Sequence, residues 1–444
     1  MNKAQYPRFL ISNFEQAADI SAKLFLMTDG RGLLEDSLRP ASMFLRCNGL
    51  VFDFFSATTE NRPLFIARCL FTGLTMSLLL MMNAFESFQF VIAIVNDHDI
   101  LEVVITCTLS SFISVALLAQ YQYVIRRKEF QEFFNVWKKV EMQNSKYRKR
   151  IKPKRKRQVL QVLYFSNLLL TLVMVPILAV NHNFQQPNSL FFPSFYAVFR
   201  DTLGMHSIYV IMMMFSYFTL LYCFLGETVS SLFFYHAGCV IEDLAREVQH
   251  TSDFFFSRKI AVRRSDGVLI DTAFHSIINT QFRQAKPFRW IWQRYETVIR
   301  SVNRGNQLFG VFILCSQFIN FLHIIMLIFT CFKLMKTSTD VAASTISACM
   351  VVTLRAILTN RLMSHLYLSR GKLQSAIGGL LSDKWYFLPN EDRELLVSFH
   401  VRLAREDLAA CPMNLFKINP TNLLTMLSLI VAYMVMIFQA DADC

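Results

Sequence analysis

Seven long apolar stretches, separated by polar segments, constrain what this chain of 444 residues can fold into. The hydrocarbon core of a bilayer is about 30 Å thick and is crossed by roughly 20 residues of α-helix. A helix pairs its backbone N–H and C=O groups internally, as lipid requires. We therefore expect an all-α, polytopic membrane protein with seven transmembrane helices. They are expected at residues 64–83, 101–125, 159–180, 202–234, 307–332, 341–362 and 421–439.

The positive charge of the chain is explained by where the basic residues lie. The formal net charge is +13 although 54% of the residues are hydrophobic, and a nucleic-acid-binding protein needs no repeated bilayer-length apolar stretches. Lys and Arg number 7, 14, 11 and 7 in segments 1–63, 126–158, 235–306 and 363–420. They number 0, 1, 2 and 0 in segments 84–100, 181–201, 333–340 and 440–444. Because cytoplasmic loops carry the excess of Lys and Arg, we expect a cytoplasmic N-terminus and an extracellular C-terminus.

This topology divides the chain into membrane and cytoplasmic parts. The membrane parts are expected at 64–125, 159–234, 307–362 and 421–439, followed by an extracellular tail, 440–444. The cytoplasmic parts are an N-terminal segment, 1–63, a basic helix, 126–158, and two parts of an anchor domain, 235–306 and 363–420. No cleavable signal peptide is expected, because the first 34 residues mix charged and apolar side chains without a continuous apolar core.

The cytoplasmic parts have helical periodicity. Apolar residues recur every three or four positions from Phe130 to Val140, from Trp290 to Val302 and from Leu395 to Leu403, which places each set on one helix face. Such stripes predict long helices that pack together next to the membrane. Residues 252–271 lack this periodicity and are expected to form a mobile loop. The run from Arg148 to Arg157 has eight basic residues in ten; it either contacts anionic lipid head groups or is a solvated flank.

The sequence lacks the stronger signatures of catalysis and cofactor binding. It contains no Gly-rich phosphate loop, no His-Glu-x-x-His, no Cys-x-x-Cys and no nucleophile elbow. We therefore expect neither an enzyme nor a cofactor. Asp97, His98 and Asp99 are three adjacent polar residues in an outer loop, where solvation is the simpler explanation, and no metal site is expected.

Polar side chains in the expected outer halves of the spans point to a binding pocket. Burying such a group in lipid without a partner is unfavourable, and small polar ligands are held in pockets of this kind. The alternative is interhelical hydrogen bonding that tightens the bundle. The candidate ligand-binding residues are Glu102, Thr106, His206, Tyr209, Asn320, His323 and Thr345, with Glu86 and Ser347 close to them.

The last span resembles the end of insect gustatory receptors. That family closes its seventh helix with Thr-Tyr, five hydrophobic residues, Gln and Phe; here Tyr433 and Gln439 match, whereas Ala432 and Ala440 replace Thr and Phe. The similarity extends to the start of this helix, Leu415-Phe416-Lys417-Ile418-Asn419, and to two N-terminal motifs, Leu38-Arg39-Pro40 and Gly49-Leu50-Val51-Phe52. Insect odorant receptors share the layout but fit the Leu-Phe-x-Ile start less well.

The resemblance implies a tastant-gated, non-selective cation channel in the plasma membrane of chemosensory neurons. It further implies a homotetramer or a heterotetramer with related receptors, a cytoplasmic anchor domain, a ligand pocket in each outer bundle half and a central pore lined by the last helix. Two other classes remain open. A secondary transporter would show inverted repeats or Gly- and Pro-broken helices. A receptor coupled to a cytoplasmic protein would have the opposite orientation.

The expected pore face follows from helical spacing. Met436, Gln439 and Ala440 lie three and four residues apart, on one side of a helix. A closed pore needs an apolar constriction, so Met436 is expected to form the gate where Ala440 replaces the family's larger residue. Asp441 and Asp443 would form carboxylate rings that concentrate cations at the outer mouth; alternatively they belong to a frayed, solvated tail.

Overall fold

The computed structural model describes residues 34–35, 37–38, 62–95, 100–145, 205–264, 287–335, 339–406 and 408–442. All regular structure within these ranges is helical. The third expected span, 159–180, the basic run at 148–157 and Asp443 lie outside them. The helices are α3 (Arg62–Val95), α4 (Ile100–Gln120), η1 (Tyr121–Ile125), α5 (Arg127–Ser145), α8 (Met205–Arg264), α10 (Pro287–Met335), α11 (Thr339–Lys384), η3 (Trp385–Phe387), α12 (Asn390–Arg405), η4 (Pro412–Asn414) and α13 (Pro420–Ala442).

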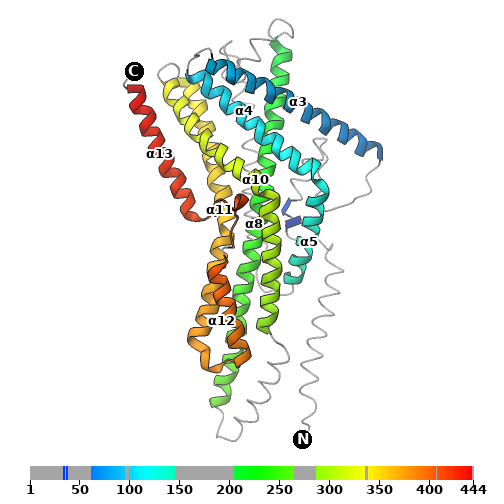
Figure 1. Ribbon diagram of the computed structural model, residues 1–444, viewed down its shortest axis with the longest axis vertical. Coiled ribbons are helices and arrows are strands. Elements are labelled where there is room, and N and C mark those ends of the chain that lie inside the picture. Colours follow the sequence, from blue (N-terminus) through cyan, green and yellow to red (C-terminus); the bar gives the residue numbers. More distant parts are fainter. Residues whose placement is uncertain are drawn as a thin grey trace.

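Three long helices form the axis of the molecule. α8, α10 and α11 contain 60, 49 and 46 residues, far more than the roughly 20 that a bilayer requires. They pack against one another and run along the long axis (Figure 1). The expected spans in these regions therefore continue as unbroken helices into the adjoining polar segments.

The expected second span breaks before its basic extension. α4 ends in the π-helical turn η1, and Arg126 leaves the helical backbone at φ −87° and ψ 21°. The guanidinium of Arg126 pairs with Glu129 in the first turn of α5, with an Nη2–Oε2 distance of 2.5 Å. The hydrogen bond from Arg126 lowers the pKa of Glu129. The break lets α5 descend and pack against α10 (Figure 1).

An aromatic core joins α5, α8 and α10. The stripe on α5 is buried, as its spacing predicts, with Phe130, Phe133, Phe134, Trp137 and Val140 at most 3% exposed. The ring of Phe233 lies 4.9 Å from that of Phe133 and 5.0 Å from that of Trp137. Gly305 allows α10 to approach this ring, because a Cβ there would clash with Phe233. The stripes on α10 and α12 are largely buried as well, although Val401 of α12 is 41% exposed.

The structure corrects the expected start of the loop at 252–271. α8 continues as a helix to Arg264, through the first 13 residues of that segment, and the rest lies outside the described ranges. The reason is that residues 252–264 contain no Gly or Pro to end the helix; the first such residue is Gly267. An apolar stripe indicates which face of a helix is buried. Its absence from residues 252–264 therefore does not exclude a helix.

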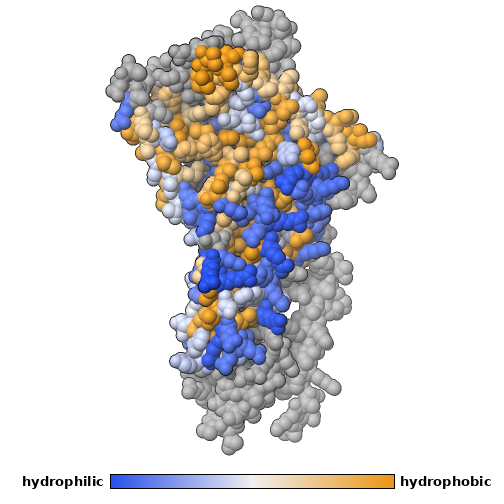
Figure 2. Space-filling model, in the orientation of Figure 1, coloured by the Kyte–Doolittle hydropathy of each residue, from blue (hydrophilic) through white to orange (hydrophobic). Residues whose placement is uncertain are grey.

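Apolar surface is concentrated at one end of the molecule. Hydrophobic residues gather over its upper half and hydrophilic residues over the middle and lower parts (Figure 2). The described helices include three segments that are long and apolar enough to span a membrane, Phe65–Val95, Leu221–Thr251 and Phe288–Phe332, and two shorter ones, Ser110–Ile125 and Pro420–Met436. The upper half is therefore the part of the molecule suited to lipid.

α13 stands apart from this bundle (Figure 1). It begins at Pro420, a residue favoured in the first helical turn, after Asn419 accepts a hydrogen bond from the Asn422 N–H at 2.8 Å. Its contacts are with α10 and α11. Ile430, 6% exposed, packs against Ile324 and Ile325 of α10, whereas most of the helix surface is uncovered.

Candidate functional site

A buried ion pair joins α8 to α11 inside the bundle. The Arg355 Nε lies 2.7 Å from the Glu227 Oε2, and the Arg355 Nη2 donates a hydrogen bond to Oε1 at 3.0 Å. The two side chains are 5% and 4% exposed. A charge-assisted hydrogen bond of this kind is among the stronger polar contacts in proteins. It accommodates an arginine in an apolar span without snorkelling, because Arg355 faces the protein interior.

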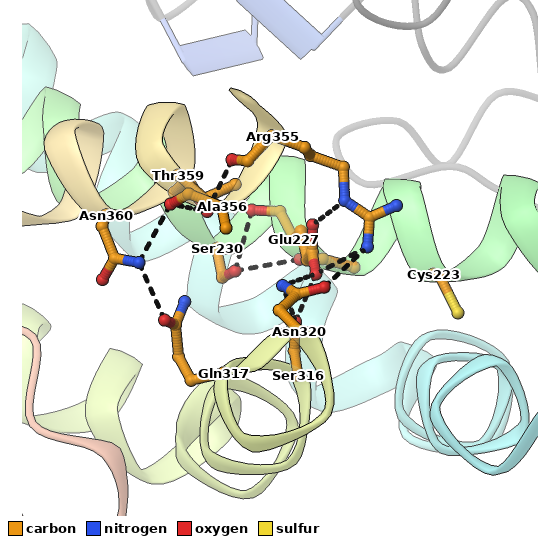
Figure 3. Close-up of polar contacts among 12 residues, drawn as sticks. Cys223, Glu227, Ser230, Ser316, Gln317, Asn320, Arg355, Ala356, Thr359 and Asn360 are labelled. Atoms are coloured by element: carbon orange, nitrogen blue, oxygen red, sulfur yellow. Dashed lines mark hydrogen bonds and ion pairs between the residues drawn. The ribbon is translucent and has the colours of Figure 1, made fainter. Parts of the chain in front are cut away.

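α10 completes this cluster with two polar side chains. The Asn320 Nδ2 donates to the Glu227 Oε1 at 2.8 Å, and the Asn320 Oδ1 accepts from the Arg355 Nη2 at 3.2 Å. Ser316, one turn away, also donates to the Glu227 Oε1. The side chains from the three helices converge on one carboxylate (Figure 3).

A second polar level lies one turn along α11. The Asn360 Nδ2 donates to the Gln317 Oε1 of α10 at 2.9 Å, beside the first cluster (Figure 3). Asn360 and Gln317 are 4% and 6% exposed. α8, α10 and α11 are thus linked by buried hydrogen bonds, and any sliding between them must exchange these contacts. A conformational switch requires two discrete sets of contacts between packed helices, and exchange of these hydrogen bonds would provide them.

Three expected pocket residues have described side chains. Thr106, Asn320 and His323 are 1%, 2% and 1% exposed. The His323 ring of α10 stacks on Phe112 of α4, with 4.2 Å between centroids, whereas the Thr106 hydroxyl donates to the Val103 carbonyl of its own helix at 3.1 Å. His323 therefore contacts α4, whereas the side chain of Asn320 hydrogen-bonds to the Glu227–Arg355 pair.

The other four expected pocket residues are described only by their backbone. Glu102 lies in α4, His206 and Tyr209 lie in α8, and Thr345 lies in α11. No group of three or more His, Cys, Asp or Glu side chains that could hold a metal ion occurs in the part of the chain that the structure describes.

The expected pore face lies on the uncovered side of α13. Met436 is 53% exposed, and Gln439 is exposed. Tyr433 is 45% exposed and makes an edge-on contact with Phe321 of α10, with 6.2 Å between centroids. Ala440 and Asp441 belong to α13 by their backbone.

The linker between α12 and α13 is clamped to α10. The Asn306 Nδ2 donates to the Ala409 carbonyl at 3.1 Å, and its Oδ1 accepts from the Cys411 N–H at 2.9 Å. A Cβ on Gly310 would lie 2.9 Å from the Met413 backbone nitrogen. Met413 has a φ of 50° and is held there by the tight turn η4. The start of α13 is thus positioned by α10. An open cavity of about 460 Å³ beside the linker is lined by Cys411, Asn414, Leu415, Phe416, Lys417, Asn419 and Asn422.

A protein-family sequence profile matches nearly the whole chain. The profile described as 7tm Chemosensory receptor matches residues 38–442. The chain belongs to this chemosensory receptor family. Its family is one of receptors rather than enzymes. A search of curated protein sequences gives no match.

The fold of the receptor matches solved insect olfactory receptors. The structure of the insect olfactory receptor OR5 from Machilis hrabei has a TM-score of 0.56 at 13% identity, over 91% of this chain and 97% of that chain. The same protein in complex with eugenol has a TM-score of 0.60 at 15% identity, over 92% and 98%. The receptor is therefore an all-α, seven-helix membrane protein.

Sequence reasoning did not identify Glu227 as part of a site. The residue lies within the expected fourth span, where its neighbours on either side are apolar or small. An acidic residue at such a position is a signal in itself, since intramembrane charges usually face the interior and pair with one another. Matching Glu227 with Arg355, a basic residue within the expected sixth span, would have predicted the contact.

Proposed function

We propose that this receptor is a gustatory chemoreceptor that acts as a tastant-gated, non-selective cation channel. Four copies, identical or mixed with related receptors, surround one pore lined by α13. A tastant bound between the helices at the end of the bundle nearer the C-terminus opens this pore. Family membership and the matching fold support a chemoreceptor channel, and the position of α13 is the observation that carries the pore assignment.

α13 is apolar yet poorly covered by its own chain. Leu424, Val431, Val435 and Met436 are 65%, 62%, 49% and 53% exposed, and among the described helices α13 packs mainly against α10 and α11. Leu424, Val431 and Val435 share one face of the helix, whereas Met436 points about 120° away from them, so exposed apolar side chains occupy more than one side. Lipid covers one side, and in a fourfold assembly the equivalent helices of the other copies cover the rest. Met436 and Gln439 then form rings around the axis, with Ala440 and the carboxylates of Asp441 and Asp443 towards the outer mouth.

The ligand site is proposed at the end of the bundle where α3 and α4 turn and α13 ends (Figure 1). The candidate contacts there are Glu102, Thr106, His206, Tyr209, His323 and Thr345. Asn320 lies one turn from His323 and hydrogen-bonds to Glu227. It links this site to the buried ion pair between α8 and α11.

The receptor is proposed to lie in the plasma membrane of chemosensory neurons with its N-terminus in the cytoplasm. The distribution of Lys and Arg supports this orientation. An epitope tag placed after Cys444 should be labelled by antibody on intact cells, and labelling only after permeabilisation would contradict it.

Recording currents from cells that express the receptor tests the proposed function. A panel of sugars, bitter compounds and volatile phenols is applied to cells that lack other chemoreceptors. At least one tastant should evoke an inward cation current that reverses near zero voltage, and anion replacement should leave that reversal unchanged. A current carried by anions, or a response that depends on G proteins, would contradict the proposal.

Gating by a volatile odorant is the second candidate. The observation that favours it is the fold match to an olfactory receptor in complex with eugenol. Responses to eugenol and related phenols, without responses to non-volatile tastants, would establish this alternative.

A further inference from the structure

One carboxylate in the bundle has no partner. Glu86 of α3 is 0% exposed, and neither of its carboxylate oxygens accepts a hydrogen bond within the part of the chain that the structure describes. It lies on the same face of α3 as Leu79, Met82 and Ala93, which are 1%, 1% and 3% exposed. The side chain therefore belongs to the inward face of α3 rather than to the lipid-facing one.

The pairing of α3 with α4 fixes the level of Glu86. The Ser87 and Ser110 hydroxyls lie 2.8 Å apart, and the Ser114 hydroxyl donates to the Asn83 Oδ1 at 3.1 Å. These bonds place Glu86 level with the turn of α4 that contains Phe112. Phe112 in turn stacks on His323 of α10. Glu86 thus lies at the same height as an aromatic pair in the proposed ligand region.

The neighbouring polar groups are already engaged. Ser87, Ser110, Asn83 and Ser114 hydrogen-bond to one another across the two helices. Glu227, another buried carboxylate of the bundle, is neutralised by its ion pair with Arg355. A buried carboxylate without such a partner is strongly unfavourable when ionised. Glu86 therefore either carries a proton or meets a cation that the described part of the chain does not supply.

We infer that Glu86 is the anionic anchor for a ligand that carries a protonated amine. This inference rests on the proposed function, because it places the anchor in the same ligand site. An ammonium group supplies the donors that the two free oxygens lack, and hydrogen bonds to charged groups are stronger than neutral ones. The aromatic faces nearby favour the same chemistry, since a cation is attracted to an aromatic ring. The ligand class is therefore organic amines with an apolar body.

Matched pairs of compounds test this inference. Currents are recorded with benzylamine against benzyl alcohol, and with phenethylamine against phenethyl alcohol, so that each pair differs in the cationic group. In the parent receptor the amine should act at lower concentration than its alcohol. Glu86→Gln keeps the shape of the side chain and removes the charge. It should raise the half-activating amine concentration by roughly 10- to 100-fold, the ratio expected from losing a hydrogen bond to a charged group, and should leave the alcohols nearly unchanged.

Two controls separate binding from folding. Phe88→Leu changes a side chain of α3 that lies two positions after Glu86 and is 63% exposed, and it should leave the preference for amines intact. Glu86→Asp keeps the charge on a shorter side chain and should retain part of the preference. Equal responses of the parent to amine and alcohol, or an unchanged amine response in Glu86→Gln, would overturn the inference.

A binding measurement distinguishes this inference from the proposed function. Thermal unfolding of the purified receptor is followed with each amine and alcohol, in the parent and in Glu86→Gln. Stabilisation by benzylamine or phenethylamine in the parent and its loss in Glu86→Gln support the anchor even if no current is recorded, in which case only the channel function fails. No stabilisation by the amines in the parent, together with normal currents to other compounds, would reject the anchor and leave the channel function in place.

Discussion

At the scale of single residues, the pairing of Glu227 with Arg355 dominates the interior of the bundle. The pair is shared among three helices, because Asn320 and Ser316 of α10 also bind the Glu227 carboxylate. A buried pair of this kind adds less stability than its geometry suggests, since both charges are removed from water. Removing one member of the pair is strongly destabilising, because the other charge then stays buried without a partner.

Arg355→Ala should destabilise the receptor by about 3 to 5 kcal/mol, as is typical for breaking a buried pair. The measurement is thermal unfolding of the purified protein, together with its yield as a single species. Arg361→Ala is the matched control, because Arg361 lies on the same helix and is exposed. Restoring neutrality with Glu227→Gln in the Arg355→Ala background should recover part of the loss. Equal stability of the two arginine variants would show that the pair contributes little.

At the scale of elements, α10 approaches the linker before α13 closely at Gly310. Gly310 faces the Met413 nitrogen at a distance that leaves no room for a Cβ, and Asn306 holds the linker at Ala409 and Cys411. A change in this contact is therefore passed directly to the start of α13.

Gly310→Ala should displace the linker and change the resting current of the channel. The added Cβ would lie 2.9 Å from backbone, which cannot move aside as a flexible side chain can. Gly371→Ala and Gly379→Ala are the controls, since a Cβ at either position meets nothing within 4 Å. Ligand-independent current, normalised to surface expression, is compared among the three variants. Identical currents in all three would show that the linker does not control the pore.

α12 packs against its own chain on one side only. Phe399 is 1% exposed and lies 5.0 Å from the rings of Trp292 and Tyr295, so it holds α12 to α10 within one subunit. Val397 and Val401, on the opposite side, are 38% and 41% exposed. These two residues form the outer face of α12, which is suited to contact between subunits.

Changes on the two sides of α12 should therefore have different effects. Phe399→Ala should lower the stability of each subunit by about 3 to 5 kcal/mol through the cavity it leaves. Val397→Ser combined with Val401→Ser should leave subunit stability nearly unchanged and reduce the fraction of tetramers. Thermal unfolding measures the first effect, and native gels or images of purified particles measure the second. Tetramers that survive the double change would exclude this face from the interface.

At the scale of the whole molecule, the sequence predicts the helical architecture better than the contacts between helices. The apolar stripe from Phe130 to Val140 indicated which face of α5 is buried, and the span expected at 421–439 lies within α13. The loop expected from residue 252 was misplaced, because missing periodicity does not end a helix. Glu227 was overlooked because its partner, Arg355, lies 128 positions later in the sequence, and only folding brings the two together.

The contacts that form the site cannot be read from a single sequence. In the sequence, Asn320 and His323 are two similar polar residues of one span. In the fold, Asn320 hydrogen-bonds to Glu227 of the ion pair, whereas His323 stacks on Phe112. The proposed pore role of α13 requires further copies of the chain, which one sequence does not show; within the described part of the chain Ile430 is the residue of α13 that is buried against the bundle.

Current through the purified receptor in a planar lipid bilayer, with and without the change Met436→Ala, tests whether α13 lines the pore. We expect the parent to be closed without ligand, because rings of Met436 constrict the pore. Met436→Ala should conduct cations without ligand, because the smaller side chain removes the constriction. Single-channel steps in the variant that are absent from the parent are the predicted result. If Met436→Ala forms intact tetramers and stays as silent as the parent, α13 does not line the pore.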